Sequence, residues 1–322
     1  MADTVIEVEN LTKIFEGKLV AVNNLSFKVE RRAIYGFLGP NGAGKTTTIR
    51  LLLGLIRPTA GEVRVFGEKM TPSASALRMK MGYLPTNPRF PPKMTPITYL
   101  DFVGRLFRLG TEDRKNRLSA LIRAVGLLGD SAREIGGFST GMLTRLGLAA
   151  ALMNDPELLI LDEPTSGLDP SGRKSTLELI EELGKEKTIF VSSHILGDID
   201  RVCTSVGVVS QGKSIFSGTI KEIKKSIRGH SIRLEVEGDV EKLCAALKGL
   251  KSVRGLEKRS DFALDIEYDP STPMADAIME TLALVSSEGL DLISVTSSSS
   301  SIEDAFVKLL RDEESRGFLR AT

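Results

Sequence analysis

The chain has 322 residues, of which 41% are hydrophobic and 26% charged, and this balance predicts a soluble globular protein with one large and one small domain. The first 220 positions carry 28 basic and 23 acidic residues and the remainder 15 and 19, so neither part has the dense basic face that binding to nucleic-acid phosphates requires. The acidic amino-terminal segment and a longest uncharged apolar stretch of Leu146–Met153 predict neither a signal peptide nor a spanning helix, which needs about 20 apolar residues.

Short apolar runs closed by glycine, proline or polar residues alternate with helix-length segments along the first part of the chain. Strands that alternate with helices predict an α/β fold with a parallel sheet covered on both faces. The expected elements are strands at Val5–Glu9 and Leu25–Val29, which form a hairpin, a strand at Ala33–Leu38, a helix at Thr46–Ile56, a strand at Glu62–Phe66, a strand at Leu158–Leu161, a helix at Ser171–Leu183, and strands at Thr188–Ser192 and Ser205–Val209.

The segment from about Thr95 to Met153 interrupts this alternation. Its spacing predicts helices at Tyr99–Leu109, Arg114–Val125 and Met142–Met153, and no strand. A cluster of prolines at positions 85, 88, 91, 92 and 96 marks its entrance as extended. We therefore expect a helical subdomain, about residues 86–155, inserted into the α/β core.

A second change of composition near Arg228 predicts a domain boundary, with one domain at 1–227 and a smaller one at 228–322. The expected order βαββαβ is the ferredoxin-like arrangement, and a last helix follows a serine run. These elements are Ser231–Val236, Val240–Leu250, Ser252–Glu257, Phe262–Glu267, Met274–Ser286, Asp291–Val295 and the final helix Ile302–Leu310.

The first motif with chemical meaning is a glycine-rich segment between an expected strand and an expected helix. It matches the phosphate-loop pattern G-x-x-x-x-G-K-[ST], and the candidate nucleotide-binding residues are Gly39, Pro40, Asn41, Gly42, Ala43, Gly44, Lys45, Thr46 and the following Thr47. Glycines let successive backbone N–H groups turn toward one centre, and the start of the helix adds the positive end of its dipole. Lys45 is expected to reach the β- and γ-phosphates, and the Thr46 hydroxyl to ligate Mg²⁺.

Two carboxylates, Asp162 and Glu163, end the apolar run at Leu158–Leu161. In a phosphate-loop enzyme, Asp162 at a strand end is expected to position the Mg²⁺ shell, directly or through water. The neighbouring Glu163 can accept a proton from the attacking water. Taken alone, this pair also fits a strand that meets solvent, and the phosphate loop favours the catalytic interpretation.

Between these motifs, Phe138–Met142 opens an expected helix. Serine and glycine at a helix start offer a hydroxyl and free N–H groups to an anion. Taken alone, the segment is better explained as an ordinary helix cap.

The phosphate loop, the Ser-Gly helix start, the run Leu158–Pro164, the segment Ser166–Asp169 and a histidine after a strand stand in one order along the chain. This series resembles the ATP-binding-cassette (ABC) ATPases over about Val5–Thr219. The resemblance implies a P-loop NTPase cassette, with a RecA-like core, an antiparallel β-hairpin region and an inserted helical subdomain, followed here by a small α+β domain.

The resemblance also implies roles for particular residues. The signature segment consists of Ser139, Thr140, Gly141 and Met142, and in the family it binds the γ-phosphate of ATP held by a second copy, so two chains enclose two nucleotides. Asp169 would link the two sites, and His194 would contact the γ-phosphate and hold the water near Glu163. Phe15 falls where the family stacks an aromatic ring on adenine.

Two departures from the family pattern narrow the expectation. Thr86 stands where the family usually has a glutamine that touches Mg²⁺ and senses the membrane partner, which puts the coupling to that partner in doubt. The signature reads Phe-Ser-Thr-Gly-Met, as in the subfamily that drives drug, lipid or polysaccharide export through a separate permease, and Ser301–Phe306 resembles that subfamily's tail.

The leading hypothesis is an ATP-hydrolysing subunit of an exporter. It would act as a homodimer with ATP and Mg²⁺, bound to a separate permease at the cytoplasmic face of the cell membrane. A second hypothesis is a soluble ABC-type ATPase that acts on ribosomes or nucleic acid, against which the charge distribution and the single cassette argue. A third is a nucleotide-gated scaffold for the C-terminal domain, against which the intact Lys45, Asp162, Glu163 and His194 argue.

Overall fold

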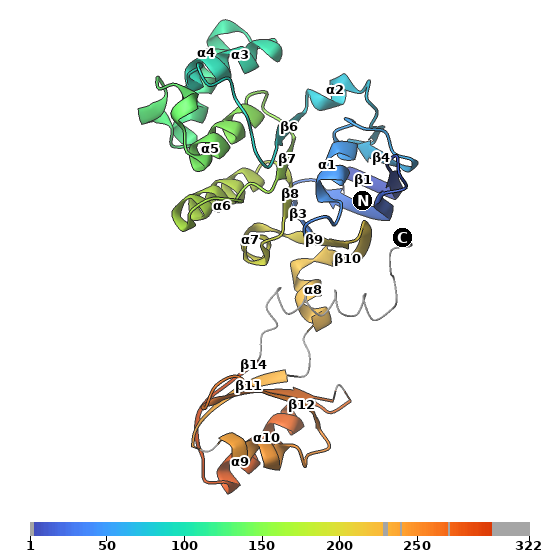
Figure 1. Ribbon diagram of the computed structural model, residues 1–322, viewed down its shortest axis with the longest axis vertical. Helices are drawn as coiled ribbons and strands as arrows, with labels where there is room; N and C mark the ends of the chain where they lie inside the picture. The colour runs from blue at the N-terminus through green and yellow to red at the C-terminus, as the bar shows by residue number, and fades with distance from the viewer. Residues whose placement is uncertain (1–2, 228–230, 239, 270, 298–322) are drawn as a thin grey trace. The chain divides into compact units, whose positions relative to one another are not determined.

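The computed structural model of the protein describes residues 3–297, apart from 228–230, 239 and 270. The expected final helix Ile302–Leu310 and the segment Ser301–Phe306 lie outside the described residues. Contacts divide the described chain between Ile220 and Lys221 into two compact units. Figure 1 labels the elements of both units, and each unit is described by itself.

An antiparallel sheet of order β2-β1-β4-β5 opens the first unit. Its strands are β1 Thr4–Ile14, β2 Val20–Glu30, β4 Ala60–Val65 and β5 Glu68–Lys69. The expected hairpin is confirmed, but both strands are longer than the sequence suggests. Asn10 and Asn24 take left-handed backbone conformations beside register shifts, and such bulges let the ladder continue past a break in the alternation.

The central sheet has the order β10-β9-β3-β8-β7-β6. Its strands are β3 Ile34–Leu38, β6 Met81–Leu84, β7 Leu158–Asp162, β8 Thr188–Ser193, β9 Ser205–Ser210 and β10 Lys213–Thr219. All neighbours pair in parallel except β10, which lies antiparallel to β9 at one edge. The expected parallel sheet is therefore confirmed. The edge strands β6 and β10 are not apparent in the sequence, because β6 is short and β10 is only half-buried.

The first unit also contains the helices α1 Lys45–Leu52, the short α2 Ser75–Arg78, α6 Pro170–Gly184 and α7 Leu196–Val202, whereas α8 Ile220–Ile227 begins at the division and continues into the second unit. Helix α1 ends earlier than the expected Ile56. Gly54 has a φ of +65°, and a Cβ there would lie 2.6 Å from the carbonyl oxygen of Thr71. A left-handed glycine at this position ends the helix.

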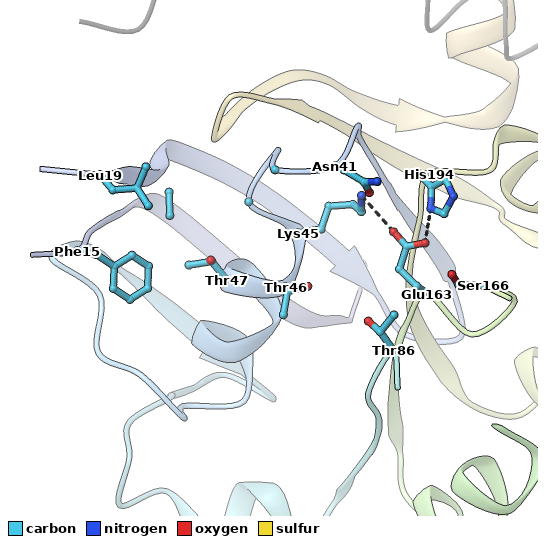
Figure 2. A pocket seen from close by; sticks show the side chains of 13 residues that line it. Phe15, Leu19, Asn41, Lys45, Thr46, Thr47, Thr86, Glu163, Ser166 and His194 are labelled. Carbon is cyan, nitrogen blue, oxygen red and sulfur yellow. Dashed lines mark hydrogen bonds and ion pairs between the residues drawn. The ribbon is translucent and has the colours of Figure 1, made fainter. Parts of the chain in front are cut away.

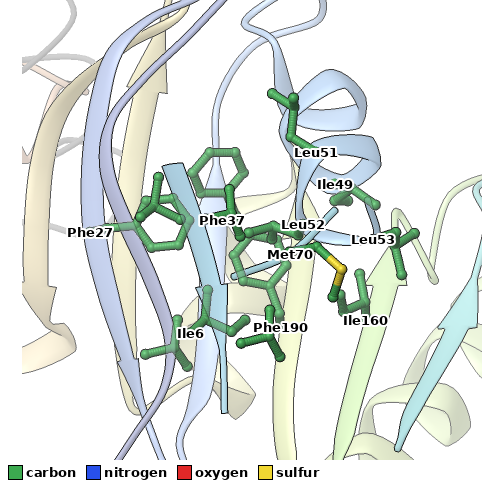
Figure 3. Packing of buried hydrophobic residues seen from close by; sticks show 14 of the residues in the cluster. Ile6, Phe27, Phe37, Ile49, Leu51, Leu52, Leu53, Met70, Ile160 and Phe190 are labelled. Atoms are coloured by element: carbon green, nitrogen blue, oxygen red, sulfur yellow. The ribbon is translucent and has the colours of Figure 1, made fainter. Parts of the chain in front are cut away.

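The main hydrophobic core joins the antiparallel sheet, α1 and the central sheet (Figure 3). Phe27, Tyr35, Phe37 and Phe190 pack with ring centroids 5.2 to 6.0 Å apart. Such pairs add to the stability that burial alone provides. Because β3 and α1 are both anchored in this core, the loop between them has fixed ends.

A helical segment with its own core lies between β6 and β7. It contains α3 Pro96–Leu106, α4 Thr111–Ala124, the short 3-10 turns Leu128–Asp130 and Ile135–Gly137, and α5 Thr140–Ala151. The expectation of three helices without a strand in this described segment is confirmed. Thr95 caps α3 and exchanges hydrogen bonds with Thr98, which sets where the helix begins.

The second unit is a four-stranded antiparallel sheet with two helices on one side (Figure 1). Its elements are β11 Ser231–Glu237, α9 Val240–Leu247, β12 Val253–Lys258, β13 Ala263–Tyr268, α10 Met274–Ser287 and β14 Asp291–Ser297. The order βαββαβ and the strand order β12-β13-β11-β14 confirm the ferredoxin-like expectation. Alternate residues of β11, Ile232, Leu234 and Val236, point into the core.

Among the described helices, none is both long enough and apolar enough to cross a membrane. Both cysteines are free thiols. Cys203 is buried against the first unit's core, and burial raises the pKa of its thiol well above the ordinary range.

Candidate active site

A cavity of about 530 Å³ opens where the parallel strands of the central sheet have their carboxyl ends (Figure 2). The residues that line it come from the β1–β2 hairpin, the loop after β3, and the loops after β6, β7 and β8. They are Phe15, Leu19, Ala21, Asn41, Gly42, Gly44, Lys45, Thr46, Thr47, Thr86, Glu163, Ser166 and His194. Carboxyl ends of parallel strands meet at the same edge of a sheet, so motifs far apart in sequence converge here.

The phosphate loop follows β3 directly and ends where α1 begins, as expected. Gly42 and Gly44 have φ of +81° and +99°, and a Cβ on Gly44 would lie 2.3 Å from the carbonyl oxygen of Ala21. Only glycine fits this close approach. The loop thus presents backbone N–H groups at the start of α1, an arrangement that suits a phosphate anion.

The Lys45 side chain is buried under this loop. Its ammonium donates hydrogen bonds to the carbonyl oxygens of Gly39 at 2.7 Å and Pro40 at 3.2 Å, and it lies 3.1 Å from Oε1 of Glu163. Gly39, Pro40 and Ala43 belong to the loop but are not among the described residues that line the cavity. Lys45 therefore joins the phosphate loop to the end of β7.

Thr46 and Asp162 place two oxygen ligands side by side. The Thr46 hydroxyl donates to Oδ2 of Asp162 at 3.1 Å, and the Ser192 hydroxyl of β8 donates to Oδ1 at 2.6 Å. Asp162 is buried. Within the described residues, no cluster of three or more His, Cys, Asp or Glu side chains could enclose a metal. A hydroxyl with one carboxylate suits Mg²⁺, which keeps several waters and completes its shell with phosphate oxygens.

Glu163 lies between two nitrogen groups at the same end of the cavity. Its Oε1 faces Lys45, and its Oε2 accepts a short hydrogen bond from Nδ1 of His194 (Figure 2). Its backbone has a φ of +54°, rare for a residue other than glycine. Hydrogen bonds from its N–H to the carbonyl and hydroxyl oxygens of Ser192 hold that conformation. A carboxylate held this way can accept a proton from a water beside a bound phosphate.

Apolar side chains form the other end of the cavity. Figure 2 shows Phe15 and Leu19 on the far side of the phosphate loop from His194. Phe15 is 37% and Leu19 55% exposed, and the Lys13 ammonium lies 5.1 Å from the centre of the Phe15 ring. A half-exposed aromatic face of this kind can stack on a planar ring.

The signature segment and Asp169 lie elsewhere. The Ser139 hydroxyl caps α5 and accepts from the N–H of Met142 at 3.3 Å, and Asp169 caps α6 in the same way through Gly172. Gly141 packs near Leu168, so the two loops are neighbours. Neither Ser139–Met142 nor Asp169 is among the described residues that line the cavity. Figure 1 shows α5 apart from α1 within the first unit.

Sequence reasoning did not assign four residues of this region, namely Leu19, Ala21, Ser166 and Ser192. Ser192 could have been singled out from the sequence, because a polar residue within the buried run of β8 needs a buried hydrogen-bond partner. Ala21 lies in β2, and Leu19 lies just before β2, where its carbonyl oxygen accepts a hydrogen bond from the Phe15 N–H at 2.9 Å. Their place depends on the fold of the antiparallel sheet.

A family model described as "ABC transporter" matches residues 22–166. The bacitracin transport ATP-binding protein BcrA of Bacillus licheniformis is 36% identical over 310 residues, which cover 95% of this chain and 97% of that protein. The linearmycin resistance ATP-binding protein LnrL of Bacillus subtilis is 31% identical, over 94% of this chain and 97% of that protein. Both relatives are therefore matched through the second unit as well as the first.

Solved structures of ABC cassettes match this chain over about the length of the first unit. An ATP-binding subunit of an ABC transporter has a TM-score of 0.63 and 28% identity, and the match covers 69% of this chain and 92% of that subunit. The ATP-binding cassette MJ0796, a dimer in a post-hydrolysis state bound to ADP and Pi, has a TM-score of 0.62 and covers 67% of this chain and 98% of that chain. At 21% identity, the second likeness concerns the fold alone.

Proposed function

The chain belongs to the ABC transporter family as an ATP-hydrolysing subunit, and from this premise we propose that two copies enclose two ATP molecules and drive export through a separate membrane permease. The observation that carries the catalytic part is the meeting of Lys45, Glu163 and His194 at one end of a cavity whose other end holds Phe15. The triphosphate of ATP would lie at the end with Lys45, Glu163 and His194, and the adenine at the end with Phe15.

Binding of ATP changes the partner of Lys45. In the structure its ammonium faces Glu163 and two loop carbonyls, whereas a phosphate-loop lysine serves the β- and γ-phosphates. Transfer of Lys45 to the phosphates frees Oε1 of Glu163, while His194 keeps Oε2 in place. Glu163 then accepts a proton from the water that attacks the γ-phosphate. Thr46 and Asp162, the latter directly or through water, would hold Mg²⁺, which would supply charge neutralisation of the phosphates.

The second copy supplies the signature segment. Ser139 and Gly141 present a hydroxyl and N–H groups at the start of α5, and these would complete the γ-phosphate site of the other chain. Asp169, beside Gly141 through the loop that holds Leu168, would link the two sites across the dimer.

Export is the direction that the relatives favour. Bacitracin transport, linearmycin resistance and Nod factor export appear in their names, so we propose a drug-like or lipid-like cargo and a position at the cytoplasmic membrane face through the permease. Thr86, which lines the cavity at the exit of β6, would report nucleotide state to that permease. Affinity purification from detergent-solubilised membranes should recover a multi-span protein. Recovery of ribosomes instead would support a soluble ATPase and contradict this proposal.

Replacing Phe15 by Ala should weaken ATP binding without slowing hydrolysis of bound ATP. Stacking on an aromatic ring contributes about 1–3 kcal/mol, so we expect KM to rise about fivefold to a hundredfold with kcat unchanged. Steady-state phosphate release measures both constants. Phe15→Tyr keeps the aromatic ring and should retain the original KM. If KM rises equally in Phe15→Tyr and Phe15→Ala, or rises in neither, Phe15 does not stack on the adenine.

The C-terminal domain, residues 228–322, is proposed to strengthen the dimer. A chain that ends at residue 227 should need a higher protein concentration to reach the same ATPase rate per molecule, because hydrolysis requires two copies. The measurement is specific rate against protein concentration for both chains. Superimposable curves would instead assign the domain a role outside dimerisation.

A further inference from the structure

Asp198 is a buried carboxylate whose two oxygens accept hydrogen bonds from two other segments. Oδ2 accepts from the Thr165 hydroxyl at 2.6 Å, and Oδ1 accepts from Nε of Arg173 at 2.6 Å. Thr165 is buried as well. A buried charge is tolerated when it is paired and hydrogen-bonded with good geometry, so these three side chains hold one another in fixed positions.

Each of the three residues belongs to a segment that carries part of the site. Thr165 lies in the loop from Glu163 to Asp169, which also closes on itself through bonds from Ser166 N–H to the Glu163 carbonyl at 3.1 Å and from Leu168 N–H to the Thr165 carbonyl at 3.3 Å. A displacement of Thr165 would therefore move the backbone of Glu163.

The other two partners lead to the remaining site residues. Arg173 lies in the first turn of α6, which Asp169 caps. Asp198 lies in the first turn of α7, which begins directly after His194 and Ile195. Asp198 itself is not among the described residues that line the cavity. One carboxylate thus joins the segments of Glu163, Asp169 and His194 without touching the cavity.

We propose that Asp198 is a positioning residue for hydrolysis, which holds Glu163, His194 and the loop to Asp169 in one arrangement. The inference rests on the proposed function, since it concerns the same ATP site. Glu163 has a left-handed backbone that persists only because the surrounding structure holds it, and a misplacement of about 1 Å can cost about a hundredfold in rate. The tether from Thr165 to Asp198 limits such shifts.

The test compares substitutions at both ends of the Thr165–Asp198 bond in the full-length chain. Thr165→Val removes the donor and keeps the shape, and Asp198→Asn removes the charge. We expect kcat to fall about tenfold in the first and tenfold to a hundredfold in the second, while KM and the dissociation constant for ATP stay within about twofold. Thr165→Ser, which keeps the hydroxyl, should restore kcat.

Asp101→Asn is the matched control. Asp101 also accepts hydrogen bonds from two other side chains, Arg105 and Arg114, but it lies in α3, and its loss should lower the melting temperature and leave kcat unchanged. The proposal is overturned if Thr165→Val and Asp198→Asn keep kcat, or if their kcat falls only together with ATP affinity and melting temperature. Glu163→Gln, measured in parallel, distinguishes a failure of the proposed function from a failure of the positioning role. Activity in Glu163→Gln would contradict the catalytic role of Glu163 on which the proposed function depends. Activity in Asp198→Asn alone would contradict only the positioning role of Asp198.

Discussion

Replacing Glu163 by Gln should leave ATP bound and nearly stop its hydrolysis. Gln keeps the shape of Glu163 but cannot accept a proton from water, and a general base is typically worth about 10²–10⁴ in rate. The phosphate loop, Thr46 and Asp162 are untouched, so the affinity for ATP should persist. If hydrolysis resets the closed dimer, as proposed, the variant should accumulate as a stable dimer with ATP. Single-turnover phosphate release and size-exclusion chromatography with ATP measure the two effects.

Glu178→Gln serves as the control for this change. Glu178 is an exposed glutamate of α6 with an ion pair to Arg201 at 3.3 Å, and a surface pair of this kind contributes little. Its turnover should match that of the unaltered chain. A Glu163→Gln variant that keeps more than about a tenth of the original rate would mean that another group activates the water.

The parts of the fold and site that the sequence predicts are those encoded locally. The phosphate loop is recognisable because Gly42, Gly44 and Lys45 stand at fixed spacing between a strand and a helix. The buried strands β3, β7 and β8 are recognisable because strands covered on both faces are apolar throughout. The ferredoxin-like order of the second unit follows from alternation within each short element.

The parts that the sequence does not predict depend on contacts between distant segments. The ion pair of Lys45 with Glu163 and the hydrogen bond of Ser192 with Asp162 require the register of β7 against β8. The edge strand β6 is too short to show alternation. No sequence pattern marks Thr165, Arg173 and Asp198. They contact one another only because α6 and α7 pack together.

The contact between Lys45 and Glu163 would control when Glu163 can act as a base. While the Lys45 ammonium lies 3.1 Å from Oε1 of Glu163, it occupies the carboxylate oxygen that an attacking water would have to approach. We expect arrival of the triphosphate to draw Lys45 away and so to free this oxygen when substrate is present. The same residue would thereby bind phosphate and restrain Glu163 beforehand.

Two inactive variants should restore activity to each other when they are mixed. Lys45→Ala loses the phosphate-binding ammonium, and Gly141→Arg blocks the signature segment. A side chain at Gly141 fits within its own chain, since a Cβ would meet only the Leu168 Cδ2 at 3.7 Å, so its effect should fall on the partner's nucleotide. Each variant alone should lose about a hundredfold or more in rate. In the mixed dimer, one site combines an intact Lys45 with an intact Gly141.

The size of the recovery tests the geometry. Random pairing of equal amounts gives mixed dimers in about half of the population, each with one intact site, so the rate should return to about a quarter of the original. A chain that carries both substitutions is the control, because its mixture with either single variant leaves every site with a defect and should stay inactive. If Lys45 and the signature of the same chain served one ATP, no mixture could recover, since each chain would hold its own defect. Failure to recover, with dimer formation verified by size, would therefore exclude completion of the site by a second copy.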